Sequence, residues 1–187
     1  DSDMPVVSRV CAIAVVALAA SCSESGRTTS PAIEPVLATA AVANDADDPA
    51  IWIDTAQPER SLIVATNKVA APDGGLYVFG LDGAIRQIVA PLDRPNNVDV
   101  EYGLMTPAGP IDIAVATERL RSQLRVYRID ERGLAPIDGG GIRVLEGETS
   151  ERAMPMGISL YRRPRDGAIF AIVAPKAGGT TSYLAEY

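Results

Sequence analysis

Beyond residue 44 the chain consists mainly of short apolar runs and largely lacks the apolar spacing of amphipathic helices. Runs rich in Val, Ile, Leu and Tyr are each bounded by Gly, Pro, Asp or Asn, as in "SLIVATN" (61–67) and "GLYVFGLDG" (75–83). The three- and four-residue spacing of an amphipathic helix is almost absent. Asp-Gly pairs in "LDG" (81–83) and "RDG" (165–167) supply the positive φ angles of hairpin turns. The pattern predicts an all-β fold.

The runs recur in a fixed order. The sequence "SLIVATN" then "GLYVFGLDG" is followed by "DIAVATE" then "LRVYRIDERG", and these by "IFAIVAPK" then "SYLAEY". Ala65-Thr66 matches Ala116-Thr117 at an offset of 51 residues, and Leu76 matches Leu124 at an offset of 48. A repeat of about 50 residues made only of strands is typical of a β-propeller, in which each repeat is one four-stranded blade.

The repeat predicts a β-propeller of which about three blades lie between residues 44 and 187. Propellers close with about four to eight blades, so we expect this chain to be the front part of a longer ring. The near-continuous apolar runs "DIAVAT" and "IFAIVA" are expected to be the innermost strands, because both of their faces must be buried. In "LRVYRID", Arg125 and Arg128 are expected to be exposed.

The first residues have the pattern of an export signal. In "MPVVSRVCAIAVVALAASC", Arg9 precedes an apolar stretch from 10 to 20 that is too short to span a bilayer. The ending "LAASC" resembles a bacterial lipoprotein signal, with lipid attached to Cys22. We therefore predict a signal peptide at 1–22, a flexible tether at 23–43 and the partial propeller at 44–187. A buried core helix is the alternative for the apolar stretch.

These features predict an exported protein, either a periplasmic or outer-membrane lipoprotein or an extracellular protein. Its contact with a membrane would be through the lipid on Cys22 only. Cys11 and Cys22 both fall within the first 22 residues, so the folded part can form no internal disulfide. At 187 residues the chain is long enough for one domain with a sizeable core, and we expect a monomer.

Charge and composition exclude several classes of function. The chain carries 17 basic and 24 acidic residues, a net charge of -7, which argues against a nucleic-acid partner. It contains no His, which excludes His-dependent phosphatases, Ser-His-Asp hydrolases and His-ligated zinc within these residues. A metal site here must therefore use oxygen ligands, which suit calcium or magnesium.

The stretch "NDADDPAIWID" (44–54) crowds Asp45, Asp47 and Asp48 directly before an apolar run. Three neighbouring carboxylates repel one another unless a helix N-terminus, a basic side chain or a metal ion lies among them. The acidic composition and the lack of His favour a cation held by oxygen atoms. A solvated turn that caps the Pro49 segment is the alternative.

Together with this cluster, "TNK" (66–68) and "RPNNVDVEYG" (94–103) resemble the β-propeller phytases, calcium-dependent phosphatases of bacterial origin. The resemblance continues in order through "GLYVFGLDG", "ATERLRS", "GISLYRRPRDG" and "VAPKAG", and so covers residues 44–187. It implies a six-bladed propeller whose acidic face binds several Ca²⁺ ions. These ions would hold the phosphates of phytate, which is inositol hexakisphosphate.

The resemblance also implies roles for individual residues. The implied metal ligands are Asp45, Asp47, Asp48 and Asp99. Asp48 and Asp99 are the candidates for activating the attacking water, although the sequence assigns no catalytic residue. The implied substrate-binding residues are Lys68, Asn97, Arg119 and Lys176. On the residues alone, a solvated lysine is the alternative for Lys68, and a turn that leads into a strand is the alternative for "NNVD".

Three departures from the family pattern affect the expected function. Glu101 stands where the family has a basic residue, Met156 where it has Tyr, and Ala177 where it often has a carboxylate. The expected function is calcium-dependent hydrolysis of phytate to lower inositol phosphates by a metal-activated water. The alternative is a non-catalytic, phytase-like propeller that acts as a binding or scaffold module.

Overall fold

The apolar runs form β-strands in the computed structural model, which describes residues 33–178 and 183–187. The first sheet consists of β1 (Ala46–Trp52), β2 (Leu62–Asn67), β3 (Gly75–Gly80) and β4 (Ile85–Val89). The second consists of β5 (Pro95–Thr106), β6 (Gly109–Glu118), β7 (Gln123–Asp130), β8 (Gly133–Pro136) and β9 (Ile142–Arg143). The third consists of β10 (Pro155–Arg162), β11 (Ile169–Pro175) and β12 (Ala185–Glu186). Three short 3-10 helices in the described residues span Pro58–Arg60, Arg119–Arg121 and Ser150–Ala153.

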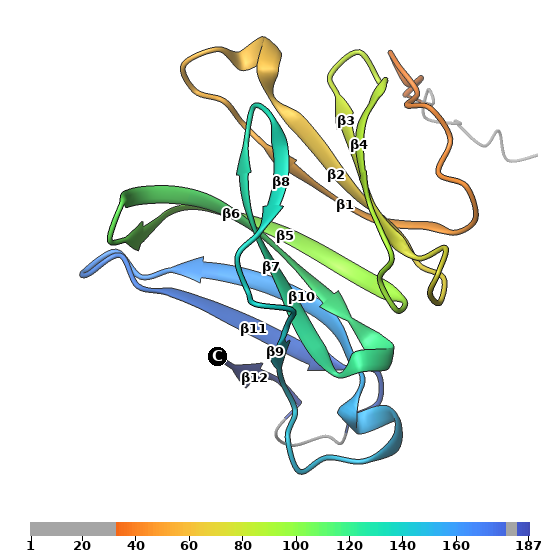
Figure 1. Ribbon diagram of the computed structural model, residues 1–187, viewed down its shortest axis with the longest axis vertical. Coiled ribbons are helices and arrows are strands. Elements are labelled where there is room, and N and C mark those ends of the chain that lie inside the picture. The colour runs from red at the N-terminus through yellow and green to blue at the C-terminus, as the bar shows by residue number, and fades with distance from the viewer. Residues whose placement is uncertain (1–32, 179–182) are drawn as a thin grey trace, which may run out of the picture. The chain divides into compact units, whose positions relative to one another are not determined.

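Each sheet is an antiparallel meander whose strands lie in chain order (Figure 1). The orders are β1-β2-β3-β4, β5-β6-β7-β8 with β9 paired to β7, and β10-β11-β12. Gly83 (φ +77) closes the turn between β3 and β4, and Gly167 (φ +73) the turn between β10 and β11. The predicted all-β fold and both Asp-Gly hairpins are therefore confirmed, and three successive sheets are consistent with the blades of a propeller.

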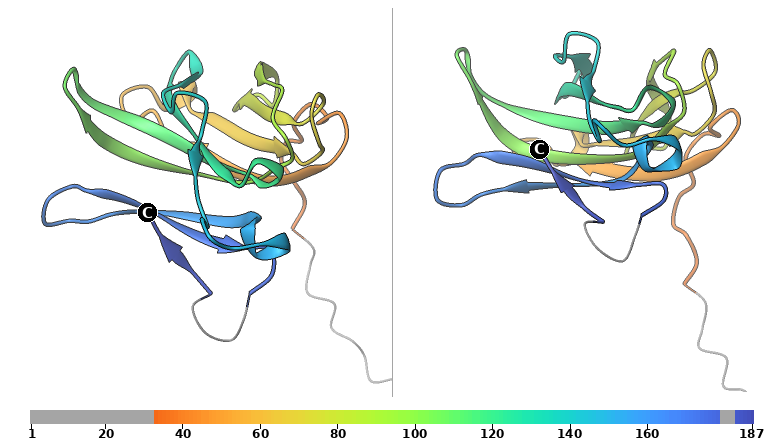
Figure 2. Two further views of the ribbon diagram at one scale, coloured as in Figure 1. Left: turned by 60° about the horizontal axis from the view of Figure 1, so that its bottom comes forward. Right: turned by 90° about the horizontal axis from the view of Figure 1, so that it is seen from below.

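The second sheet lies next to both of the others, and the first strands of the sheets meet (Figure 2). Strand β5 contacts β1 on one side and β10 on the other. The prediction that "DIAVAT" and "IFAIVA" are innermost is therefore wrong, because these runs are β6 and β11, the second strands of their sheets. A continuous apolar run indicates burial on both faces, and in β6 that burial falls one strand away from the edge where the sheets converge.

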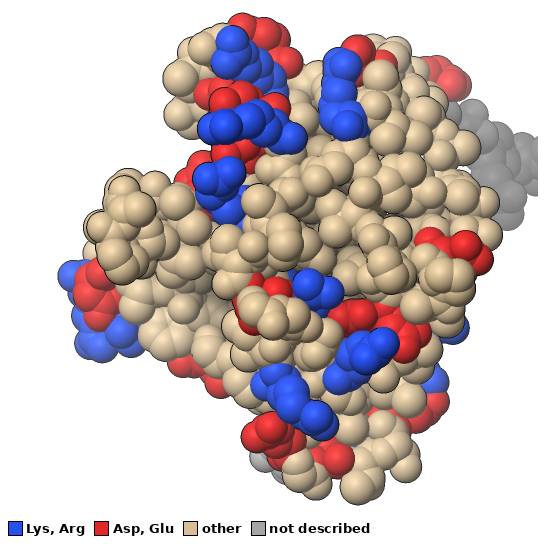
Figure 3. Space-filling model, viewed as in Figure 1, with Lys and Arg blue, Asp and Glu red and all other residues tan. Residues whose placement is uncertain are grey.

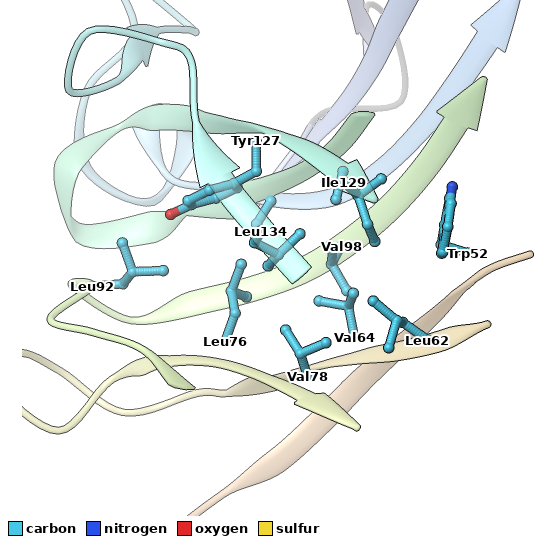
Figure 4. Close-up of a cluster of buried hydrophobic side chains, with 12 residues drawn as sticks. Trp52, Leu62, Val64, Leu76, Val78, Leu92, Val98, Tyr127, Ile129 and Leu134 are labelled. Atoms are coloured by element: carbon cyan, nitrogen blue, oxygen red, sulfur yellow. The ribbon is translucent and has the colours of Figure 1, made fainter. Parts of the chain in front are cut away.

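The alternation along β6 shows how one strand serves two cores. Ala114 and Ala116 pack with Val64 and Val78 of the first sheet, in a cluster that also includes Tyr127 (Figure 4). Ile113 and Val115 point to the opposite face and pack with Val173 of the third sheet. Since successive side chains of a strand point to opposite faces, every apolar position of "IAVA" is buried against a neighbouring sheet.

A polar network is buried beside β7. The Asp138 side chain is 0% exposed and accepts hydrogen bonds from Arg125 Nε (2.8 Å) and from the Val126 backbone N–H (2.9 Å). Although burial raises the pKa of Asp138, these bonds and the Gly140 N–H hold that pKa below its ordinary value. The expectation that Arg125 is exposed is wrong, since its side chain is 16% exposed in this ion pair.

The predicted signal peptide, with Cys11 and Cys22, lies outside the described residues, as does the tether up to residue 32. From 35 to 45 the chain forms neither helix nor strand, and the Ala40 N–H donates to the Gly83 carbonyl (2.8 Å). Within the described ranges, no helix has both the length and the apolar character needed to cross a membrane.

Candidate functional site

The predicted site residues meet at one end of the three sheets, here called the site end. At this end Ala46 pairs with Asn67, Pro95 with Glu118, and Pro155 with Pro175. The first strand of each sheet thus begins where the second strand ends. The residues that directly follow the second strands are Lys68, Arg119 and Lys176. Each sheet therefore contributes one of the three predicted cations to the site end.

Lys68 is the positive partner that the described structure gives to the acidic cluster. Its Nζ lies 2.6 Å from Asp47 Oδ1 and 3.9 Å from Asp45 Oδ2. The Lys68 backbone N–H also donates to the Asp45 carbonyl (2.8 Å), which fixes the lysine beside the start of β1. Of the three positive partners considered from the sequence, a basic side chain is therefore present, and it relieves the repulsion between Asp45 and Asp47.

Asp48 links the first sheet to the second. Its Oδ2 accepts a hydrogen bond from the Val98 backbone N–H of β5 (2.9 Å). Its own N–H donates to Thr66 Oγ1 (3.1 Å), and the Thr66 hydroxyl donates in turn to the Asn96 carbonyl (3.0 Å). Thr66 is fully buried, so its bond to Asn96 joins the two sheets away from solvent.

The same link recurs between the second and third sheets. Asp99, which lies 51 residues after Asp48, accepts the Leu160 backbone N–H of β10 through Oδ2 (2.7 Å). Thr117, which lies 51 residues after Thr66, accepts the Asn97 N–H (3.0 Å) and donates to the Met156 carbonyl (2.8 Å). Both carboxylates proposed to activate water therefore also hold neighbouring sheets together.

Arg119 is buried at the centre of the site end and is only 7% exposed. Its Nη2 donates to Asn96 Oδ1, and the other end of the Asn96 amide donates to Asn97 Oδ1 (2.6 Å). Burial, and then the nearby charge of Arg94, lower the pKa of Arg119 from its ordinary value, which the charges of Asp47 and Glu151 partly offset. Asn96 thus orients Arg119 and connects it with Asn97.

Lys176 forms an ion pair with Glu151, whose charge also reaches Arg119. The site end therefore alternates in sign, with the Asp47–Lys68 pair on one side of Arg119 and the Glu151–Lys176 pair on the other. Where the view of Figure 3 includes this end, at the lower right, acidic and basic side chains lie next to one another. The three cations are therefore separated by carboxylates and do not form one continuous basic surface. A ligand with several negative groups could contact each cation with a different group.

The structure brings Lys68 together with Asp45 and Asp47, and it places Arg119 between that group and Lys176. It does not gather the four predicted metal ligands, because no group of three or more His, Cys, Asp or Glu side chains in the described residues is arranged to hold a metal ion. Asp99 has both oxygens engaged, since Oδ1 accepts the Val100 N–H (2.8 Å) and Oδ2 the Leu160 N–H. The metal and substrate roles of these residues stay predictions.

Two residues that the sequence analysis did not select belong to this end. Glu151 pairs with Lys176, and Arg94 directly precedes β5, where its charge acts on Arg119. The position of Arg94 before "PNNVD" was a usable signal. Glu151 has no comparable signal, because its approach depends on how the short helix Ser150–Ala153 packs beside β11.

The three departures from the family pattern lie at different distances from the site end. Met156 and Ala177 are at the site end, where the Met156 carbonyl accepts the Thr117 hydroxyl and the Ala177 N–H donates to the Glu151 carbonyl (3.4 Å). Glu101 is four residues beyond Asn97 along β5, about 13 Å at the rise of an extended strand. Its charge is therefore well separated from the cations of the site end.

Comparison with known proteins identifies the family of the chain. A family model described as Phytase matches residues 4–185. The chain is also 34% identical over 142 residues to a protein named 3-phytase from Bacillus subtilis (strain 168). That match covers 74% of this chain and 35% of the relative, so the chain spans about a third of the length of the relative that it matches. The chain belongs to the phytase family.

Proposed function

We propose that the protein is a calcium-dependent phosphomonoesterase that hydrolyses phytate to lower inositol phosphates and phosphate. Family membership supports phytate as the substrate, and the name of the Bacillus relative supports the reaction. Calcium dependence and the metal-activated water rest on the chemistry of the residues at the site end. The proposal concerns the whole protein, of which this chain carries the cations and carboxylates described above.

One observation carries the proposal: three successive sheets place Lys68, Arg119 and Lys176 at the same position after their second strands. A fold that repeats a cation in this way creates several phosphate-binding groups at one end. Phytate has phosphates all around a small ring, so it can contact cations from several sheets at once. Each charge-assisted hydrogen bond to a phosphate is about twice as strong as a neutral one.

The donor set at the start of β1 fits calcium, because carboxylates are the oxygen ligands that this hard cation prefers. Asp45, Asp47 and Asp48 would contribute part of the coordination shell. Asp45 suits this role best, since among the described residues its carboxylate has only Lys68 nearby, at 3.9 Å. When bound, calcium would neutralise phosphate charge and lower the pKa of a water for attack on phosphorus.

The chain's own residues have defined tasks in this proposal. Lys68 and Lys176 would bind phosphate oxygens, each in exchange for its present carboxylate partner. Arg119, held by Asn96, would offer a pre-oriented guanidinium that stabilises charge on the equatorial oxygens during transfer. Asp48 and Asp99 are the candidates for orienting the attacking water, and their bonds to neighbouring sheets would fix their positions.

A non-catalytic, phytase-like binding module is the second candidate, and Met156 and Ala177 favour it. Both lie at the site end, where a Tyr hydroxyl and a carboxylate would otherwise be expected. Glu101 argues less strongly for this candidate, since it is about 13 Å along the strand from Asn97.

Phosphate release from calcium phytate by the purified protein, with and without a chelator, tests the proposal. We expect release that the chelator abolishes and that Lys68→Gln lowers about tenfold or more in kcat/KM, since a contact with a charged group is lost. Arg86→Gln is the matched control, because Arg86 forms an exposed ion pair with Asp82 at the opposite end of the first sheet. A folded protein that binds phytate without releasing phosphate would favour the binding module.

We also propose that the protein is a monomer exported as a lipoprotein anchored through Cys22. The apolar stretch and the "LAASC" ending support this proposal. Mass spectrometry of the mature N-terminus tests it, and a lipid on Cys22 that is lost in Cys22→Ala is the expected result. An unprocessed N-terminus in the cytoplasm would contradict it.

A further inference from the structure

Arg94 has an unusual backbone for a residue with a large side chain. Its φ is +61, in the left-handed region that Gly or Asn adopts more readily. The conformation is held by hydrogen bonds on both sides, from the Arg94 N–H to the Val69 carbonyl (3.0 Å) and from the Arg119 N–H to the Arg94 carbonyl (3.1 Å). These bonds fix Arg94 between the loop after β2 and the residue after β6.

The guanidinium of Arg94 lacks a counter-charge in the described chain. Nine other arginines there have a carboxylate within ion-pair distance. Arg94 has none, and its Nε is buried without a hydrogen-bond acceptor. Arg119 is 7% exposed, and its Nε is also buried and unpartnered. Buried donors without acceptors are rare in folded proteins and costly, so each of these two requires an explanation.

The two arginines are also close enough to repel each other. The charge of Arg94 lowers the pKa of Arg119, second only to the effect of burial. Asp47 and Glu151 act in the opposite direction, but they are paired with Lys68 and Lys176. Two partly desolvated guanidinium groups with free donors are complementary to an anion that accepts several hydrogen bonds from both.

We propose that Arg94 and Arg119 together clamp one phosphate group, which makes Arg94 a further phosphate-binding residue of the site. The inference rests on the proposed function for the identity of the substrate. Arg119 would be the rigid half of the clamp, because Asn96 holds its Nη2, and Arg94 would close on the phosphate from the loop before β5. A planar guanidinium suits this task, since its fork of donors matches two phosphate oxygens.

The same oxygens could belong to a phosphate ester of the substrate or to inorganic phosphate left after hydrolysis. Two measurements on the purified protein separate these sources. Calorimetric titration with inorganic phosphate reports binding of the free ion, and steady-state kinetics with calcium phytate report binding of the ester. If the clamp holds the ester, Arg94→Gln raises KM more than it lowers kcat.

Arg94→Gln removes the charge, and Arg94→Lys keeps the charge but removes the fork. We expect Arg94→Gln to weaken phosphate binding about tenfold or more, and Arg94→Lys to recover only part of the loss. Arg162→Gln is the matched control, since Arg162 also has no carboxylate within ion-pair distance in the described residues but ends β10 away from the site end. It is expected to bind phosphate like the unmodified protein.

Unchanged phosphate affinity and KM in folded Arg94→Gln would overturn the clamp. If that variant loses thermal stability, Arg94→Lys decides, and an unchanged affinity in this charge-conserving variant also overturns the clamp. Failure of the proposed function is distinguishable, because the unmodified protein would then release no phosphate from phytate while Arg94→Gln still weakens phosphate binding.

Discussion

Replacing Thr117 by Val tests whether the repeated hydrogen-bonded link holds the sheets together. The Thr117 side chain is 0% exposed, accepts the Asn97 N–H and donates to the Met156 carbonyl. Valine has nearly the same shape, so the substitution removes both bonds and leaves two partly buried backbone groups without these partners. At about 1–2 kcal/mol for each group, the expected loss is about 2–4 kcal/mol.

For a domain of this size, each kcal/mol shifts the melting temperature by about 2–4 °C. We therefore expect Thr117→Val to melt about 4–16 °C below the unmodified protein in a calorimetric or circular dichroism scan. Thr66→Val should give a similar loss, because Thr66 makes the corresponding two bonds, one within the first sheet and one to the second sheet. Thr55→Val, at an exposed position, is the matched control.

Hydrogen exchange locates the effect. The Asn97 amide should exchange faster in Thr117→Val, whereas strand β3 should keep its protection until global unfolding. A Thr117→Val protein that melts within about 2 °C of the Thr55→Val control would refute the reasoning, since the hydroxyl would then contribute nothing to the junction of the sheets.

Three further predictions concern buried groups. The folded pKa of Asp138 lies below its unfolded value near 3.8, so its carboxylate stabilises the fold above about pH 4, and this contribution is lost as the pH falls through the folded pKa. Asp138→Asn should therefore be less stable at pH 7 and lose less additional stability between about pH 5 and 2, as measured by urea unfolding. Burial raises the pKa of Tyr127 to about 12, and its hydroxyl has no partner in the described residues. Tyr127→Phe should accordingly keep or gain thermal stability, and a loss above about 1 kcal/mol would show that the hydroxyl has a partner. Gly74→Ala should destabilise the fold by about 1–3 kcal/mol, because the alanine Cβ would press against two backbone carbonyl oxygens. A urea unfolding midpoint equal to that of the unmodified protein would contradict this packing.

The strand content and the repeat could be predicted from the sequence because both are local. Runs such as "SLIVATN" have the composition of buried strands, and an offset of 51 residues relates Thr66 to Thr117 without any knowledge of packing. The cations at the site end could also be placed, since Lys68 and Arg119 directly follow strands that the apolar runs define. The innermost strands could not be identified, because an apolar run such as "IAVA" indicates burial but not the order of strands in a sheet.

The contacts between sheets could not be predicted from local patterns in the sequence. Asp48 was selected for its charge, yet its observed partner is a backbone N–H on a strand 50 residues away. The position of Arg94 before "PNNVD" was a signal in the sequence, but its lack of a counter-charge becomes visible only when the neighbouring side chains are in place. The offset that relates Thr66 to Thr117 also relates Asp48 to Asp99, and it was the one sequence signal for a shared structural task.

The links through Thr66 and Thr117 each join a sheet only to the next one along the chain, which has a mechanical consequence. When such a molecule is pulled from its ends, it unfolds one sheet at a time, because breaking one junction between neighbouring sheets leaves the next junction intact. Release of the first or the second sheet would lengthen the chain by about 50 extended residues, or about 17 nm. Under force the protein should therefore extend in discrete steps, with each step marking the failure of one threonine hydroxyl and one aspartate.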